Sequence, residues 1–277
     1  MKKLLILLLI GSFANGYAQV STPAPSPLCK IEQKIGLATV SVEYSRPSKK
    51  NRIVFGDLVP YGKTWRTGAN ACTKVTFSDD LEVQGVKVPK GSYALLSVPG
   101  EESWEVILYN DITVSGVPDP YDVSKEVARV KVTPELIPYT VESFTIGFDE
   151  LRNESATLMI IWETSLVPVK LRFDTDTKVM KNIEKVMAGP SSNDYYQAAR
   201  YYFENNKDLN MSLKWIQVAN QLDPQFWKLR VESLILAKLG RKAEAIEVAQ
   251  KSKAKAIEAK NDEYVKMNDD SIKEWSN

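Results

Sequence analysis

The chain has 277 residues, with 36 basic and 35 acidic side chains and no histidine. This near-neutral balance gives no excess of positive charge with which to bind nucleic acid or an anionic membrane surface, and we predict neither as a partner. The missing histidine excludes the usual Ser-His-Asp and Cys-His catalytic systems and removes the commonest zinc and copper ligand. We therefore expect no metal site and no cofactor, and acid–base chemistry near neutral pH would fall to carboxylates, lysine or tyrosine.

Residues 1–18 have the pattern of a secretory signal peptide. Two lysines precede an unbroken apolar run at 4–10, and small residues occupy positions −3 and −1 of a cleavage site after Ala18. The apolar run is too short to cross a bilayer, which argues against an uncleaved anchor. We expect an exported mature chain, periplasmic or associated with a bacterial cell envelope, with no membrane span after the signal is removed.

Residues 19–30 are rich in Pro and Ser and predict an extended tether, because proline lacks an amide donor and fixes its φ angle. Residues 31–173 predict an antiparallel β-sandwich. The stretch 37–44 alternates Leu, Thr, Ser and Glu with Ala, Val, Val and Tyr, as a strand with one buried face does. Residues 93–98 and 104–109 flank a Pro-Gly turn and predict a hairpin. Short strands at short intervals without a long helix are typical of this fold class.

Residues 174–277 predict an α-helical segment. The phrase "TKVMKNIEKVMAGP" indicates a linking helix that ends at Gly189-Pro190. An internal repeat follows at an offset of 33 residues, in which Ser212-Leu213 aligns with Ala245-Ile246. This segment resembles tetratricopeptide repeats, whose period is about 34 residues, although Ser212 stands where a small Ala is usual. The resemblance implies a protein partner for the helical surface.

The stretch "VPYGKTWRTGAN", residues 59–70, holds an unusual density of polar and aromatic side chains between two glycines. An arginine beside a tryptophan can offer a planar fork to an anion and can stack on a ring, and asparagine adds donors and acceptors. Two interpretations stay open here: a packed corner of the β-domain, in which these side chains serve the fold, and a ligand site for a small anionic or sugar-like molecule. The candidate residues are Arg46, Arg52, Tyr61, Lys63, Trp65, Arg66 and Asn70.

A longer stretch around this one resembles the bacterial family catalogued as domain of unknown function 2911. The matching phrases are Ser45-Arg46-Pro47, Leu58-Val59-Pro60-Tyr61-Gly62, Trp65-Arg66-Thr67-Gly68-Ala69-Asn70, Pro89-Lys90-Gly91-Ser92-Tyr93, "VARVKV" and Trp162-Glu163. The resemblance covers roughly residues 30–172 and implies an exported, β-rich domain without an assigned reaction. One departure lies at 111–122, where the family usually carries a tryptophan and this chain has none.

Three functions fit the sequence. The leading interpretation is a non-catalytic binding or interaction module, and no catalytic residue is assigned. The first alternative is a hydrolase acting on carbohydrate or envelope material, which needs two carboxylates facing each other across a cleft. The second is a structural envelope component, in which Trp65 is a core anchor and Arg66 pairs with a carboxylate such as Asp57 or Glu163.

Cys29 and Cys72 are the two cysteines of the chain. An even number of cysteines in an exported protein invites a disulfide, and two free thiols are the alternative. The sequence leaves both open.

Overall fold

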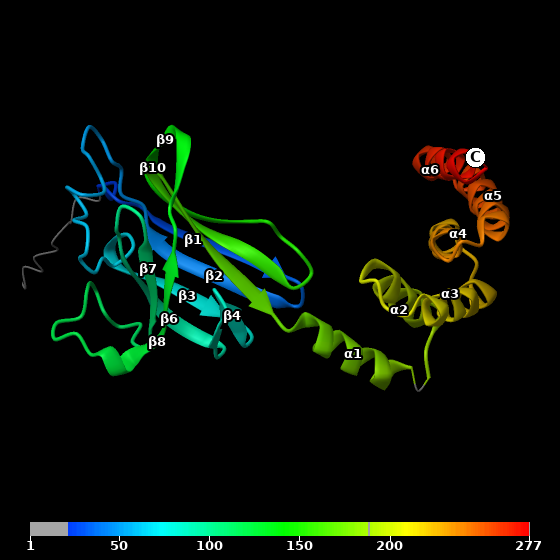
Figure 1. The fold of residues 1–277 in the computed structure, drawn as a ribbon, viewed down its shortest axis with the longest axis horizontal. Helices are drawn as coiled ribbons and strands as arrows, with labels where there is room; N and C mark the ends of the chain where they lie inside the picture. The colour runs from blue at the N-terminus through cyan, green and yellow to red at the C-terminus, as the bar shows by residue number, and fades with distance from the viewer. Residues whose placement is uncertain (1–21, 188, 277) are drawn as a thin grey trace, which may run out of the picture. The chain divides into compact units, whose positions relative to one another are not determined.

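The structure is a computed structural model that describes residues 22–187 and 189–276, and the predicted signal peptide lies outside them. The chain divides into two compact units, one ending at Thr175 and the other beginning at Asp176. The first is built of strands and the second of helices (Figure 1). None of the described helices is long and apolar enough to cross a membrane.

The first unit is an antiparallel β-sandwich, as the sequence predicts. Within the described residues one sheet has six strands in the order β1-β2-β3-β6-β7-β8, and the other has four in the order β5-β4-β10-β9. The strands are β1 (Leu28–Ile35), β2 (Ala38–Ser45), β3 (Ala69–Phe77), β4 (Leu81–Val83), β5 (Val86–Val88), β6 (Gly91–Val98), β7 (Trp104–Tyr109), β8 (Glu126–Val132), β9 (Glu135–Asp149) and β10 (Ser155–Phe173), with a short 3-10 helix, η1 (Val123–Lys125), before β8.

The main core lies between the two sheets, and strand alternation fills it. In β2, every second residue from Ala38 to Tyr44 is buried, whereas the residues between them are less buried. The predicted polar and apolar faces of this strand are confirmed. Strands from the other sheet supply Phe144 and Ile160 to the same core. Burial of such side chains stabilises each by roughly 1.5–3 kcal/mol.

Strand β10 folds back on itself. The amide of Phe173, its last residue, donates to the carbonyl of Glu154, just before its first residue, at 2.7 Å. A straight strand of this length would instead separate its two ends by roughly 60 Å. Near its middle, Glu163 has a φ of 55°, and the pairing with β9 shifts register on both sides of it. The chain therefore reverses at Glu163, next to Trp162.

The structure does not join the two cysteines, and both are free thiols. Cys29 packs against the core between the sheets, whereas Cys72 packs with Leu96 and Tyr109 on the outer face of the six-stranded sheet. Successive residues of a strand point to opposite faces, so two thiols on opposite faces of one sheet cannot meet without rebuilding a strand. This corrects the candidate disulfide. Burial raises the pKa of the Cys72 thiol to about 12.

The predicted tether is partly incorporated into the sandwich. Strand β1 begins at Leu28, and the amide of Arg46 donates to the carbonyl of Pro27 at 2.9 Å. The sandwich therefore begins before residue 31, where the sequence pattern placed its start.

The second unit consists of helices, as predicted for this part of the chain. They are α1 (Thr175–Val186), α2 (Ser192–Glu204), α3 (Leu209–Leu222), α4 (Phe226–Lys238), α5 (Lys242–Glu258) and α6 (Asp262–Trp275). Helix α1 ends just before Gly189-Pro190, and α2 begins with a capping box in which Ser191 and Asp194 satisfy each other's amides. The core of this unit includes the fully buried Ile216 and Ile235.

Candidate functional site

A pocket of about 570 Å³ opens beside the loop that joins β2 to β3, and we call it the basic pocket. Its volume lies in the range of small-molecule sites, roughly 300–1,000 Å³. Three short segments and one residue of β10 line it. The lining residues are Pro25, Ser26, Pro47, Ser48, Lys50, Arg52, Leu58, Val59, Pro60, Lys63, Thr64, Trp65, Arg66, Gly68, Ala69, Asn70 and Trp162.

Four of these residues are cations and none is a carboxylate. Lys50 and Arg52 come from the beginning of the loop, and Lys63 and Arg66 come from its end. Residues 45–70 hold six basic side chains and one acidic one, Asp57, although the whole chain is almost neutral. The chain-wide balance therefore conceals a local excess of basic side chains in this stretch.

The two arginines of the pocket bind neutral backbone carbonyls. Arg66 Nη1 donates to Asn70 O at 2.7 Å and to Ser115 O at 3.2 Å. Arg52 donates through Nε to Lys49 O at 3.0 Å and through Nη2 to Ser48 O at 2.6 Å. These bonds fix the direction of both guanidinium groups but leave their charge uncompensated.

The nearby carboxylates are engaged elsewhere. Glu163 lies 3.1 Å from the ammonium of Lys49 and accepts from the amide of Val54 at 3.2 Å. Glu142 accepts from the backbone amide of Lys50 at 2.8 Å. The expected pairing of Arg66 with Asp57 or Glu163 is therefore wrong, because β10 carries Glu163 to Lys49 instead. Within the described chain, Arg66 has no ion-pair partner.

Trp65 links the pocket to the core. Its ring meets Phe55, Phe144, Trp104 and Trp162 at centroid distances of 5.2–6.5 Å. Its indole N–H donates to Gly68 O at 3.1 Å, and that of Trp162 donates to Glu142 O at 3.1 Å. Both N–H groups are thus used internally. Trp162 is buried, so it is mainly the partly buried ring of Trp65 that offers carbon to the pocket.

The backbone from Thr67 to Asn70 makes a tight turn, and Gly68, Ala69 and Asn70 line the pocket. Thr67, Gly68 and Asn70 all have positive φ angles, of 52°, 151° and 58°. A Cβ added to Gly68 would lie 3.0 Å from Thr73 Oγ1 and 3.2 Å from Ser45 O, so only glycine fits without displacement. This close approach holds Trp65 and Arg66 in place on one side of the turn and Asn70 on the other.

Asn70 ties the turn to the amino-terminal segment. Its Nδ2 donates to Ser26 O at 3.2 Å and to Ser45 Oγ at 3.2 Å. The amide oxygen of this exposed side chain has no hydrogen bond within the described residues. Asn70 can therefore accept a hydrogen bond from a bound molecule.

Five of the seven predicted ligand residues line the basic pocket, namely Arg52, Lys63, Trp65, Arg66 and Asn70. Arg46 does not, because its guanidinium donates to Phe144 O at 2.9 Å and to Thr145 Oγ1 at 2.7 Å, joining β2 to β9. Tyr61 also does not line it, and its ring lies against Gly56 across the loop. These two residues shape the surroundings of the pocket.

Sequence reasoning missed Lys50, Trp162 and the contribution of Pro25 and Ser26. Lys50 had a visible signal, because it lies in a basic run two residues before Arg52. Trp162 belongs to one of the phrases that match the family, but only the folding of β10 brings it to Trp65.

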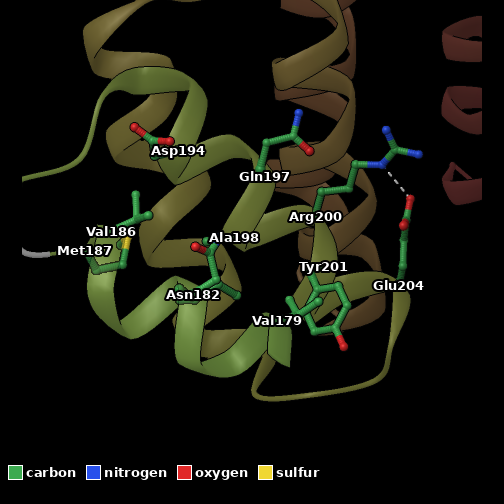
Figure 2. Close-up of a pocket in the computed structure, with 11 residues that line it drawn as sticks. Val179, Asn182, Val186, Met187, Asp194, Gln197, Ala198, Arg200, Tyr201 and Glu204 are labelled. Carbon is green, nitrogen blue, oxygen red and sulfur yellow. Dashed lines mark hydrogen bonds and ion pairs between the residues drawn. The ribbon is translucent and has the colours of Figure 1, made fainter. Parts of the chain in front are cut away.

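A second pocket, of about 270 Å³, lies between α1 and α2 (Figure 2). Its wall is largely apolar, including Val179, Val186 and Met187. The charged groups at its rim are already paired: Arg200 with Glu204 at 2.6 Å, and Asp194 within the capping box. This pocket offers no uncompensated charge, which makes the basic pocket the better candidate.

Carboxylate chemistry finds little support in the described residues. Those carboxyl groups whose pKa departs from the ordinary range all have it lowered, chiefly by hydrogen bonds from neighbouring donors. They are Asp111, Asp122, Glu126, Asp176, Asp194, Asp223 and Glu244. A general acid needs a raised pKa. The described chain also contains no group of three or more Asp, Glu or Cys side chains placed to hold a metal ion.

Comparison with known proteins identifies one family. The family model described as "Protein of unknown function (DUF2911)" matches residues 26–171, which is more than half of the chain. The match includes every residue that lines the basic pocket except Pro25. No curated protein and no solved structure matches the chain.

Proposed function

Because the chain belongs to the DUF2911 family of proteins of unknown function, we propose its function from the chemistry of its own pocket. The β-sandwich is a non-catalytic binding module, and a small anionic ligand occupies the basic pocket. The observation that carries this proposal is the lining: four cations, no carboxylate, and a volume of about 570 Å³. A neutral sugar would leave those charges uncompensated, so an anion is favoured over an uncharged ligand.

Binding is favoured over hydrolysis because the pocket lacks the acid–base pair that glycoside hydrolysis requires. The nearest carboxylates, Glu142 and Glu163, serve the loop around Lys49 and Lys50. With four cations and no carboxylate among its lining residues, the pocket is suited to holding an anion and lacks the carboxyl groups that glycoside hydrolysis uses as acid and base.

Binding is also favoured over a purely structural role. If the loop around the basic pocket served only the fold, its charged side chains would pair with one another and no cavity would remain. Arg46 and Trp65 do serve the fold, but the ammonium groups of Lys50 and Lys63 have no partner within the described residues. Placing unpaired cations around an open cavity costs stability through mutual repulsion, and a bound anion relieves that cost.

We infer that the helical unit is a short tetratricopeptide-like array and that it binds a protein partner. Helix α2 begins at Ser192 and α4 at Phe226, 34 residues later; α3 begins at Leu209 and α5 at Lys242, 33 residues later. Ser212 stands where such repeats usually have alanine. Its buried hydroxyl is accommodated because it donates a hydrogen bond to Ala199 O at 2.7 Å. Regular helix pairs at this spacing support the repeat.

We further propose that the mature protein works outside the cytoplasm, in the periplasm or at the cell envelope. The support is the signal-peptide pattern of residues 1–18. Amino-terminal sequencing of the protein from a secreting host tests it: a start at Gln19 is expected, and a retained Met1 would oppose it.

A thermal-shift screen of the mature protein tests the binding proposal. The panel contains inorganic and organic anions, neutral sugars and peptides. Several anions should raise the melting temperature, and the effect should weaken as sodium chloride screens the cations. If neutral sugars or peptides stabilise the protein and anions do not, the proposal is wrong.

A further inference from the structure

We propose that the ligand of the basic pocket is a phosphate monoester whose ester group has an apolar body about the size of one ring. This inference rests on the proposed function and adds the charge and shape of the ligand. It is carried by three features of the pocket: the number of uncompensated cations, their origin in two segments, and the carbon surface beside them.

The charge of the pocket calls for more than one negative charge. Lys50 and Lys63 have no ion-pair partner in the described chain, and Arg52 and Arg66 bind only carbonyls. A monoanion would offset one of these four positive charges. A phosphate monoester carries close to two negative charges above its second pKa, near 6.

The cations approach from two parts of the loop. Lys50 and Arg52 lie in the segment 47–52, and Lys63 and Arg66 lie in the segment 58–70. A phosphate group presents three terminal oxygens in different directions, whereas a carboxylate presents two in one plane. The tetrahedral group can therefore accept from donors on both segments, and arginine and lysine are the usual donors to phosphate.

The remaining surface suits an apolar body. Trp65 uses its indole N–H internally, and the exposed side chains of Leu58 and Pro60 add further carbon. A pocket of about 570 Å³ has more room than inorganic phosphate would fill. Burying a ring against this surface removes apolar area from water, which favours binding.

The pocket would hold such an ester without cleaving it. Among its lining residues are neither carboxylates nor cysteines. No carboxylate or thiolate is therefore at hand to attack the phosphorus or to activate water, and the ester bond stays intact.

The test is a calorimetric titration of the mature protein with three probes. Phenyl phosphate and phenyl sulfate have nearly the same shape but carry about two and one negative charges at pH 7.5, and inorganic phosphate lacks the ring. Phenyl phosphate should bind at least tenfold more tightly than either of the others. Its advantage over phenyl sulfate should shrink below pH 6, as phosphate takes up its second proton.

Two variants tie the result to the pocket. Lys63→Gln should weaken phenyl phosphate binding at least fivefold, whereas Lys87→Gln, a change of an exposed lysine on β5, should leave it unchanged. Far-UV circular dichroism checks that both variants are folded. Equal affinity for phenyl sulfate and phenyl phosphate would overturn the inference while the binding of anions stands. If no anion in the thermal-shift panel binds either, the proposed function fails with it.

Discussion

Trp65 stacks on Trp162 with ring centroids 6.0 Å apart and planes inclined by 17°. One ring comes from the loop that carries the basic pocket, and the other comes from the reversal of β10 in the opposite sheet. The stack therefore fixes the pocket to the core of the sandwich. Rigid support of this kind holds binding side chains in place before a ligand arrives.

Trp65→Ala should destabilise the β-sandwich by about 3 kcal/mol, because the large ring leaves a cavity among the surrounding aromatic side chains. Urea unfolding of the full chain, followed by circular dichroism, measures the change. Tyr139→Ala, at a residue of β9 that is 62% exposed, is the control and should shift stability by less than about 0.5 kcal/mol. A loss below about 1 kcal/mol for Trp65→Ala would contradict its role as an anchor.

Arg66→Ala should weaken anion binding at least tenfold and cost only about 1 kcal/mol of stability. The cost is small because Arg66 bonds to carbonyls and leaves no stranded carboxylate when it is removed. Arg66→Lys keeps the charge but loses the planar fork, and should bind anions with intermediate affinity. If Arg66→Ala melts much earlier and binds anions normally, the residue holds the fold instead.

The cysteines should behave as separate thiols. We expect the intact mass of the mature protein to stay the same on reduction, since Cys29 and Cys72 lie on opposite faces of one sheet. Burial raises the pKa of Cys72 to about 12, so iodoacetamide at pH 8 should label Cys72 only after the chain unfolds. Rapid labelling of Cys72 in the native protein, located by peptide mapping, would oppose this burial.

Acid should weaken the hydrogen bonds that Asp111 accepts from Thr113 and Lys125 at the start of the segment 111–122. Hydrogen bonds from Thr113 and Lys125 lower the pKa of Asp111 to about 2 from its ordinary 3.8. A lowered pKa in the folded state stabilises the fold above about pH 4 and loses that contribution as the pH falls toward 2. Asp111→Asn should therefore lower the urea midpoint at pH 7 and have little effect near pH 2. An effect of equal size at both values would mean that charge is not involved.

Much of the β-sandwich could be predicted from local pattern. The hairpin predicted at 93–98 and 104–109 appears as β6 and β7, because alternation and turn chemistry are local properties. The linking helix appears as α1 for the same reason. The reversal of β10 was not predicted, since its residues form one continuous β-rich run without glycine, and its proline, Pro168, follows Glu163 only after five residues.

The sequence indicated which stretch of the chain holds most of the candidate site, but it did not indicate which residues contact one another there. Residues 59–70 contain four of the lining side chains that the sequence singled out, because a tight glycine turn keeps them close. The partners of Arg46 and Glu163 were not predictable, since each lies about a hundred residues away in sequence. Pairings of that kind depend on the stacking of the two sheets.

The most direct measurement is made on the double variant Lys50→Gln/Lys63→Gln. If these ammonium groups surround an anion site, removing two like charges should leave the unliganded protein as stable as before or stabilise it by about 0.5 kcal/mol, while anion binding is lost. Urea unfolding and calorimetric titration of the same preparation give both values. Unchanged anion affinity, or a variant that is clearly less stable, would contradict the assignment of the basic pocket as an anion-binding site.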